Sequence, residues 1–276
     1  MLSGAAGLGA APVLRAAGAA GRMAHRLHAG NPSPDELRRL FGARPIDVAA
    51  TACRISELRH RNRAMAAIVA KRSLSSVIDL ADEESVEQLQ QLRRAGPAVL
   101  LTWHMGTVLG LATLLARGAI PALIVRTGFF YTGPQCLEFA YTAGGERDRV
   151  ATLLRAVNRL RDGGLVVIAA DGPDPAETMT VRCFGRRVAF ARGPFAMSRM
   201  SRTAIVPLAP YWNTSGKIAL RLGAPLPKDA ASGRRDVDAE QVPADAAASW
   251  LESYLSEAPH ELWVYTLRRL LAAREW

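Results

Sequence analysis

The feature that most limits the fold of this chain is an alternation of short apolar segments with helical patterns, which begins after Gly96-Pro97. The apolar segments have the length of strands that are buried on both faces. A strand, a helix and a further strand in this order form a parallel sheet covered by helices. The sequence therefore predicts an α/β fold with a mostly parallel, mixed sheet flanked by helices. The predicted strands are 98–102, 122–125, 165–170, 204–208 and 218–222, and the predicted helices between them are 107–116, 149–161 and 194–201.

A single large domain suits the length of 276 residues, because a chain of this size buries enough surface to fold without a disulfide or a structural metal. Residues 34–94 carry two helix start signals, so a helical N-terminal segment precedes the sheet. Residues 1–33 are rich in Ala and Gly, with Pro12 as an expected helix break, and predict a weakly ordered or interfacial arm. A single α/β domain is expected over residues 34–276. Residues 225–243 predict an exposed linker before two C-terminal helices.

The net charge of +10 is concentrated in one part of the chain. Between Thr178 and Lys228 there is no Asp or Glu. Such a stretch attracts phosphates on nucleic acids, anionic lipids, coenzyme A or an acidic carrier protein, and a solvated basic face is the alternative. Nucleic-acid binding finds no further support, since no recognition motif occurs. The basic residues of this stretch are Arg182, Arg186, Arg187, Arg192, Arg199, Arg202, Lys217, Arg221 and Lys228.

Cysteine usage points to a reducing compartment. The three cysteines, Cys53, Cys136 and Cys183, are an odd number at spacings that fit neither a zinc site nor a redox pair. The sequence therefore predicts no metal, and no segment carries a convincing cofactor-binding motif. No segment supplies the roughly twenty apolar residues that a membrane span requires.

Two of the predicted strands end in residues that suit acid–base chemistry. His104 follows the strand at 98–102, and Asp171 follows the strand at 165–170. The carboxyl ends of parallel strands share one edge of a sheet, so both side chains can face one crevice. An imidazole titrates near neutral pH and can act as a general base. The alternatives are a structural histidine and a carboxylate that caps an Asp-Gly-Pro turn; Gly106, which permits close approach of the backbone, favours a functional role.

The connection after Asp171 is much longer than usual, at roughly twenty residues before the next helix, and indicates a lid or a binding loop. It contains a predicted hairpin with Gly185-Arg186-Arg187 at its tip. The segment Arg192-Gly193-Pro194 then begins a helix, whose free amides suit a phosphate or a developing oxyanion. The arginines of both segments are therefore predicted to line the rim of the site and to bind a phosphate-bearing donor.

These motifs occur in a characteristic order along residues 34–270: Trp103-His104-Met-Gly, Arg126, Asp171-Gly-Pro, Phe184-Gly185-Arg186, Arg192-Gly193-Pro194, Ala204-Ile-Val-Pro207, and a Pro-x-x-x-Trp pattern from Pro259 to Trp263. This order resembles the lysophospholipid acyltransferase superfamily, and most of all the bacterial lipid A lauroyl and myristoyl acyltransferases. The resemblance implies acyl transfer from an acyl-carrier-protein or coenzyme A thioester to a hydroxyl or amine. By this resemblance His104 would be the general base, and Asp171, at the same edge of the sheet, is the candidate residue to hold His104 or to compensate for it. The residues expected to bind substrate are Arg126, Phe184, Gly185, Arg186, Arg187, Arg192 and Gly193.

One position departs from the pattern of the family that the chain resembles. The fifth residue after the histidine is Asp or Glu in that pattern, and here it is Leu109, expected one to two helical turns beyond His104. Leucine cannot orient an imidazole, so either Asp171 takes this role or activity is weak. The alternative function is a non-catalytic member that binds lipid or acyl-carrier-protein. A serine hydrolase is disfavoured, because no Gly-x-Ser-x-Gly elbow occurs.

The expected partners are an acyl-carrier-protein or coenzyme A donor and a lipid or small-molecule acceptor, with peripheral contact to an anionic membrane and no nucleic acid. The expected location is the cytoplasm, peripheral on the inner face of the cell membrane.

Overall fold

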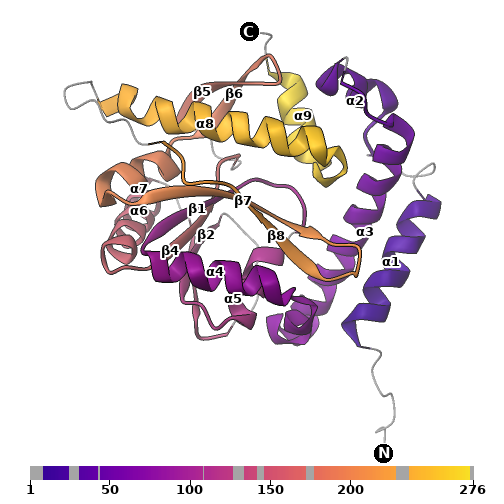
Figure 1. Ribbon diagram of the computed structural model, residues 1–276, viewed down its shortest axis with the longest axis horizontal. Helices are drawn as coiled ribbons and strands as arrows, with labels where there is room; N and C mark the ends of the chain where they lie inside the picture. Colours follow the sequence, from indigo (N-terminus) through magenta and orange to yellow (C-terminus); the bar gives the residue numbers. More distant parts are fainter. Residues whose placement is uncertain are drawn as a thin grey trace, which may run out of the picture.

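The centre of the molecule is a six-stranded sheet with the order β3-β2-β4-β1-β7-β8 (Figure 1). A computed structural model describes residues 9–24, 31–42, 44–107, 109–126, 134–141, 146–171, 177–227 and 236–273. The strands from β3 to β7 in this order run parallel, and β8 runs antiparallel to β7. The α/β class and the mostly parallel sheet are confirmed. The strands are β1 (Ala98–Thr102), β2 (Ala122–Arg126), β3 (Leu137–Tyr141), β4 (Leu165–Ala169), β7 (Ala204–Trp212) and β8 (Ile218–Leu222).

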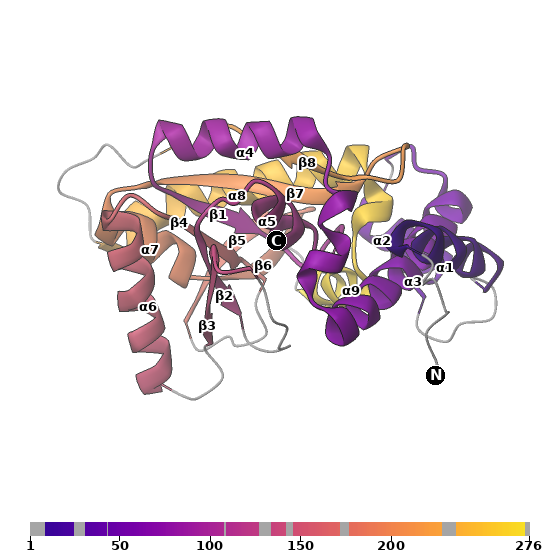
Figure 2. The ribbon, with the colours of Figure 1, turned by 90° about the horizontal axis from the view of Figure 1, so that it is seen from below.

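Helices cover both faces of this sheet, because its central strands are apolar on both faces. Val99 and Leu101 of β1 pack into one core, whereas Ala98 and Leu100 pack into the other. Figures 1 and 2 show α8 and α4 on opposite sides of the sheet. The first core is closed by α2 (Pro34–Phe41), α6 (Glu146–Arg161), α7 (Gly193–Ser201), α8 (Asp236–Glu257) and α9 (Val264–Ala272). The second is closed by α3 (Val48–Arg72), η1 (Leu74–Leu80), α4 (Glu83–Ala95) and α5 (Gly110–Arg117).

The helical N-terminal segment is present, and its helices begin at the residues that carry start signals. Ser33 and Glu36 form a reciprocal capping box at the start of α2. Asp82 caps α4 by accepting a hydrogen bond from the backbone N–H of Ser85, 3.1 Å away. After α4 the chain turns at Gly96, whose φ of 133° suits glycine, and enters β1.

Part of the predicted N-terminal arm is a packed helix. Helix α1 (Ala10–Ala24) lies against α3, and Leu14 is buried. The expected break at Pro12 does not occur, because Pro12 lies in the first turn, where its missing N–H has no partner to lose. A Cβ on Gly21 would lie 2.8 Å from the carbonyl oxygen of Ser56, so the two helices are in close contact there. The domain boundary at residue 33 stays a prediction. Among the residues that the structure describes, no helix combines the length and the apolar character of a membrane span.

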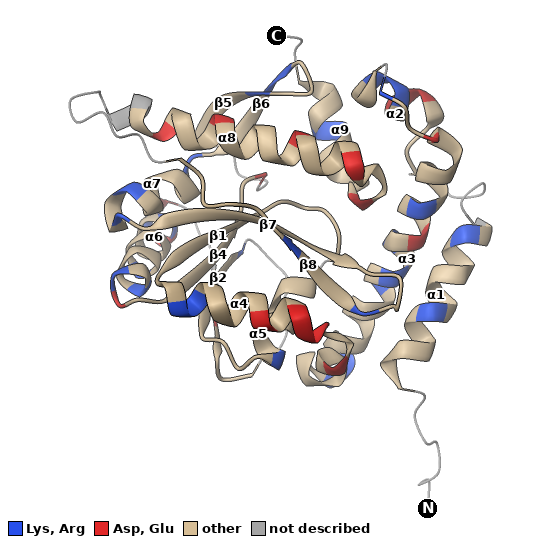
Figure 3. Cartoon of the chain, in the orientation of Figure 1, with Lys and Arg blue, Asp and Glu red and all other residues tan. Residues whose placement is uncertain are grey.

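The linker predicted over residues 225–243 is wrong from residue 236 onward, where α8 begins. Glu240 of α8 is buried and pairs with Arg192 at 2.6 Å and with Arg199 at 2.9 Å. Glu240 is buried between Arg192, at the N-terminus of α7, and Arg199, within α7, and this pairing fixes α8 in place. Composition alone does not reveal such a long-range pairing. The acid-free stretch is therefore partly neutralised by acids from elsewhere, and Figure 3 shows Lys and Arg dispersed over α1, α3, α6 and α7.

Candidate functional site

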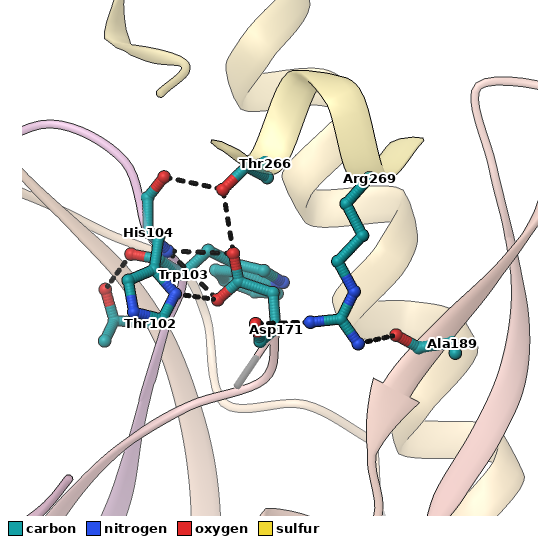
Figure 4. A network of polar contacts seen from close by, with 7 residues as sticks. All are labelled: Thr102, Trp103, His104, Asp171, Ala189, Thr266 and Arg269. Carbon is teal, nitrogen blue, oxygen red and sulfur yellow. Dashed lines mark hydrogen bonds and ion pairs between the residues drawn. The ribbon is translucent and has the colours of Figure 1, made fainter. Parts of the chain in front are cut away.

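Strands β1 and β4 bring His104 and Asp171 to the same edge of the sheet. The strands pair in parallel with Thr102 opposite Ala169, and each of the two polar residues lies two positions beyond that pair. The backbone N–H of Ala170 donates to the carbonyl oxygen of Thr102 at 2.8 Å, which extends the ladder toward the site. Nδ1 of His104 lies 2.9 Å from Oδ1 of Asp171 (Figure 4). The structure thus joins the two residues paired in the sequence analysis, and their catalytic role stays a prediction.

The carboxylate of Asp171 is held by several donors. The backbone N–H of His104 lies 3.0 Å from each of its two oxygens, and Oγ1 of Thr266 lies 2.9 Å from Oδ2. The guanidinium of Arg269 donates to the carbonyl oxygen of Asp171 at 2.5 Å and to that of Ala189 at 3.4 Å. Because Asp171 is only 4% exposed, the bonds from His104 and Thr266 determine the orientation of the carboxylate, whereas Arg269 holds the backbone beside it.

Thr266 and Arg269, which were not predicted from the sequence, lie three residues apart on α9 and face the pair (Figure 4). The Pro-x-x-x-Trp pattern from Pro259 to Trp263 was the one sequence motif predicted near these two residues. Thr266 is buried on the otherwise apolar side of α9, and a buried hydroxyl requires a partner. The identity of that partner depends on tertiary packing, so the sequence did not indicate it.

The turn that carries His104 is fastened to the C-terminal segment through Gly106. Its N–H donates to the carbonyl oxygen of Glu261 at 2.7 Å, and its own carbonyl oxygen accepts from Asn62 and from the indole of Trp263, each at 2.8 Å. Gly106 has a φ of 59°, and a Cβ there would lie 1.8 Å from the carbonyl oxygen of Pro210. The close backbone approach expected at Gly106 is therefore present.

Two opposing effects act on the ionisation of His104, whose side chain is 35% exposed. Burial lowers the pKa of His104, but the hydrogen bond and the negative charge of Asp171 outweigh burial, so the pKa is raised above the ordinary value of 6.5. The positive charge of Arg269 lowers it slightly. With the proton on Nδ1 directed to Asp171, the nitrogen that can accept a proton from a ligand is Nε2.

His104 lies on the wall of a cavity of about 1530 Å³, which is larger than a usual small-molecule site. Most of its wall is apolar, including Leu58, Leu111, Val167 and Met197. Figure 2 shows α6 on one side of β2 and β4 and the α3–α9 pair on the other, and residues of all these elements line the cavity. Its charged lining residues are Arg59, Arg63, Arg126, Arg149, Arg268, Arg269, Glu146 and Glu177.

Two of the predicted substrate-binding residues line this cavity. Arg126, at the end of β2, lies with its guanidinium carbon 5.5 Å from the ring centre of Phe139. Gly193 lies in the first turn of α7, which begins where the sequence predicted a helix start. The N-terminal end of α7 therefore faces the cavity.

The other predicted substrate-binding residues do not line the cavity. Phe184 and Gly185 form the turn between β5 (Thr178–Cys183) and β6 (Arg186–Ala191), and the ring of Phe184 packs edge-on against Phe41 at 5.4 Å. Arg186 donates to the carbonyl oxygens of Ala273 and Arg39, and Arg187 lies beside it on β6. The hairpin is present as predicted, but its tip leans on α2 and α9 instead of the site.

Arg192 also lies outside the cavity lining, because its guanidinium turns toward the buried Glu240. Apart from Arg126 of β2 and Glu177, the charged residues that line the cavity lie on α3, α6 and α9, which the local density of arginines did not indicate. The Gly-Pro residues after Asp171 lie outside the described residues.

Leu109 differs from its expected place. It lies directly before α5, and residues 103–107 are not helical, so the prediction of one or two helical turns after His104 is wrong. The chain leaves β1 through the Gly106 turn, which prevents a helix from starting there. Leu109 is buried and lines the cavity. The carboxylate that contacts Nδ1 of His104 is that of Asp171.

Comparison with families of known proteins gives a match. The sequence model of a family described as bacterial lipid A biosynthesis acyltransferase matches residues 58–272, which include His104, Asp171 and Thr266. A comparison with curated proteins finds no match.

Proposed function

This chain belongs to the bacterial lipid A biosynthesis acyltransferase family, and from that premise we propose that it moves a fatty acyl group from a thioester donor to a hydroxyl or amine. The donor is an acyl-carrier-protein or coenzyme A thioester, and the acceptor is a lipid or another small molecule. The observation that carries this proposal is that His104 lies on the wall of a large, mainly apolar cavity and is bonded to Asp171 at 2.9 Å.

In the proposed reaction, Nε2 of His104 takes the proton of the acceptor hydroxyl or amine. At the same time the oxygen or nitrogen of the acceptor attacks the carbonyl carbon of the thioester. The tetrahedral oxyanion collapses, the carbon–sulfur bond breaks, and the thiolate receives the proton from the imidazolium. Asp171 holds Nδ1 and stabilises the imidazolium. The N-terminal end of α7, at Gly193, is a suitable place for the oxyanion, since helix N-termini favour negative charge.

The arginines of the cavity support binding of a phosphate-bearing substrate. Arg59 of α3 lies close enough to Arg63 and Arg268 for their charges to lower its pKa, with burial as the larger cause. Arg268 already pairs with Glu36 at 3.5 Å, and an anion in the cavity would relieve the repulsion that remains among these arginines. We therefore transfer the donor-binding role, assigned to Arg186, Arg187 and Arg192 by the sequence analysis, to this group.

Arg59→Gln/Arg63→Gln is expected to raise the donor KM about tenfold and to weaken its dependence on salt, because charge-assisted contacts to phosphate are lost. The turnover number should change little. Arg187→Gln, on the exposed side of the hairpin, is the matched control. Steady-state kinetics at two salt concentrations measure both effects. Equal KM values in the double variant and the wild type would assign the anion site to other residues.

A peripheral position on the inner face of the cell membrane is part of the proposal. Val150 of α6 and Tyr265 of α9 line the cavity and are 51% and 44% exposed. Together with arginines of the same cavity, these apolar side chains suit contact with an anionic lipid surface. Sedimentation with vesicles that contain anionic lipid measures this contact.

The deciding experiment is incubation of the purified protein with labelled acyl-carrier-protein and acyl-coenzyme A, each with hydroxyl and amine acceptors. Acyl transfer to an acceptor supports the enzyme and identifies the donor. Binding of the donor without turnover would favour the alternative, a member that binds lipid or carrier protein without catalysis. Leu109, at the position of the motif carboxylate, is the observation behind that alternative.

The rate of acyl transfer is expected to rise with pH and to level off above the pKa of His104. Only the neutral imidazole can take a proton, and Asp171 raises the pKa of His104 above 6.5, so the inflection should lie above that value. In Asp171→Asn the inflection should move to lower pH, because burial and the charge of Arg269, which both lower the pKa, then act without an opposing charge. Measurement of kcat from about pH 5 to 9 tests this. The same inflection in both proteins would contradict the assignment of His104 as the base.

A further inference from the structure

We propose that Thr266 is a positioning residue, whose hydroxyl holds the carboxylate of Asp171 in the plane that orients His104. This inference rests on the proposed function, in which the His104–Asp171 pair moves the proton. Thr266 comes from α9, far along the chain from both residues, and touches both of them (Figure 4).

The hydroxyl of Thr266 lies between two acceptors. Its Oγ1 is 2.8 Å from the carbonyl oxygen of His104 and 2.9 Å from Oδ2 of Asp171. A carbonyl oxygen and an ionised carboxylate both only accept, and a threonine hydroxyl carries one proton. The carboxylate is charged and is therefore the stronger acceptor. We place the proton on the side of Oδ2.

This bond complements the others on the carboxylate. Oδ1 accepts from Nδ1 of His104 at 2.9 Å, and the backbone N–H of His104 is shared between both oxygens at 3.0 Å each. Without the hydroxyl, Oδ2 would keep only its part of that shared bond. The carboxylate could then rotate about its own axis, and Oδ1 would leave the direction of Nδ1.

A comparison with another buried hydroxyl separates this arrangement from ordinary helix packing. Thr113 of α5 is also buried, and it donates to the carbonyl oxygen of Leu109, four residues earlier, at 2.9 Å. Such back-bonding is the usual way in which a helical threonine satisfies its hydroxyl. Thr266 is 2% exposed, and its hydroxyl contacts His104 and Asp171, which follow the ends of β1 and β4. Its hydroxyl thus serves the site.

Thr266→Val removes the hydroxyl and keeps the shape of the side chain, so we expect kcat to fall about tenfold while the donor KM stays the same, since one bond to a charged group is lost. Thr266→Ser restores the hydroxyl and should return kcat to within about twofold of the wild type. Thr113→Val is the matched control and should leave kcat unchanged. A purely structural role would not produce this split between kcat and KM or the rescue by serine.

Proton NMR gives a readout that does not depend on turnover. The Nδ1 proton of His104, bonded to a buried carboxylate, should give a low-field resonance in the wild type. We expect this resonance to move upfield and broaden in Thr266→Val and to persist in Thr266→Ser and Thr113→Val. Should Thr266→Val fail to fold, Thr266→Ala, which removes the hydroxyl without crowding, gives the same comparison.

The two readouts separate this inference from the proposed function. If the wild type transfers no acyl group, the proposed function is refuted. If the low-field resonance is nevertheless present in the wild type and lost only in Thr266→Val, the positioning role is retained. An unchanged resonance and unchanged kcat in Thr266→Val would refute the positioning role, whatever the wild type transfers.

Discussion

Asp171→Asn is expected to lower the rate of acyl transfer by about 10⁴-fold, as loss of the orienting carboxylate does in Ser-His-Asp enzymes. The amide has nearly the same shape, so it can still accept the backbone N–H of His104. It carries no charge to stabilise the imidazolium, and its NH₂ group, turned toward Nδ1, would favour the wrong tautomer. Nε2 would then hold the proton in most molecules, and only the minor tautomer could act as a base. Measurement of kcat at the pH optimum of each protein tests this.

Asp79→Asn is the matched control for this prediction. The Asp79 carboxylate is 92% exposed and pairs with Arg117 on the surface, so its loss should leave kcat unchanged. Thermal unfolding of both variants shows whether the fold is retained. A folded Asp171→Asn variant with wild-type turnover would remove Asp171 from the mechanism and leave Leu109 without a substitute carboxylate.

Gly106→Ala is expected to lower the free energy of unfolding by more than about 4 kcal/mol, among the largest losses that single substitutions cause. The new Cβ would lie 1.8 Å from the carbonyl oxygen of Pro210 and 3.0 Å from its carbonyl carbon, so backbone must move. That movement would also break the bonds from Gly106 to Asn62 and Trp263. Denaturant unfolding measures the loss.

Gly185→Ala is the control that measures the cost of backbone strain in the absence of a clash. Gly185 has a φ of 70°, similar to the 59° of Gly106, but no atom lies within 4 Å of its Cβ position. Its loss should therefore reflect strain alone, about 1 to 2 kcal/mol. Equal losses in the two variants would mean that the turn at Gly106 relaxes without cost and that close backbone contact does not hold it.

The sheet and the central pair could be predicted from the sequence, because both follow from local patterns. Apolar segments of strand length, separated by helical patterns, specify a parallel sheet, and polar residues after such strands meet at one edge. His104 and Asp171 are of this kind. Strand β3 was missed, since Glu138 interrupts its apolar pattern and ion-pairs with arginines of α6.

The rest of the site depends on packing between distant segments. Four of the six arginines that line the cavity lie on α3 and α9. These helices come before and after the sheet in the sequence, and only the fold brings them to the same cavity. Arg192 was misplaced because its buried partner, Glu240, lies in a segment whose composition predicted a linker. Local charge density indicates basic residues, but it does not indicate which of them have acidic partners.

The register of β1 against β4 makes the site sensitive to chain length. His104 and Asp171 each follow their last paired residue by two positions. Deletion of one residue from either strand would slide its end by about 3.3 Å and turn the following side chain to the opposite face of the sheet. Insertions and deletions are thus far more harmful in these two strands than apolar substitutions of similar size. Variation in length can be accommodated instead in connections away from this edge.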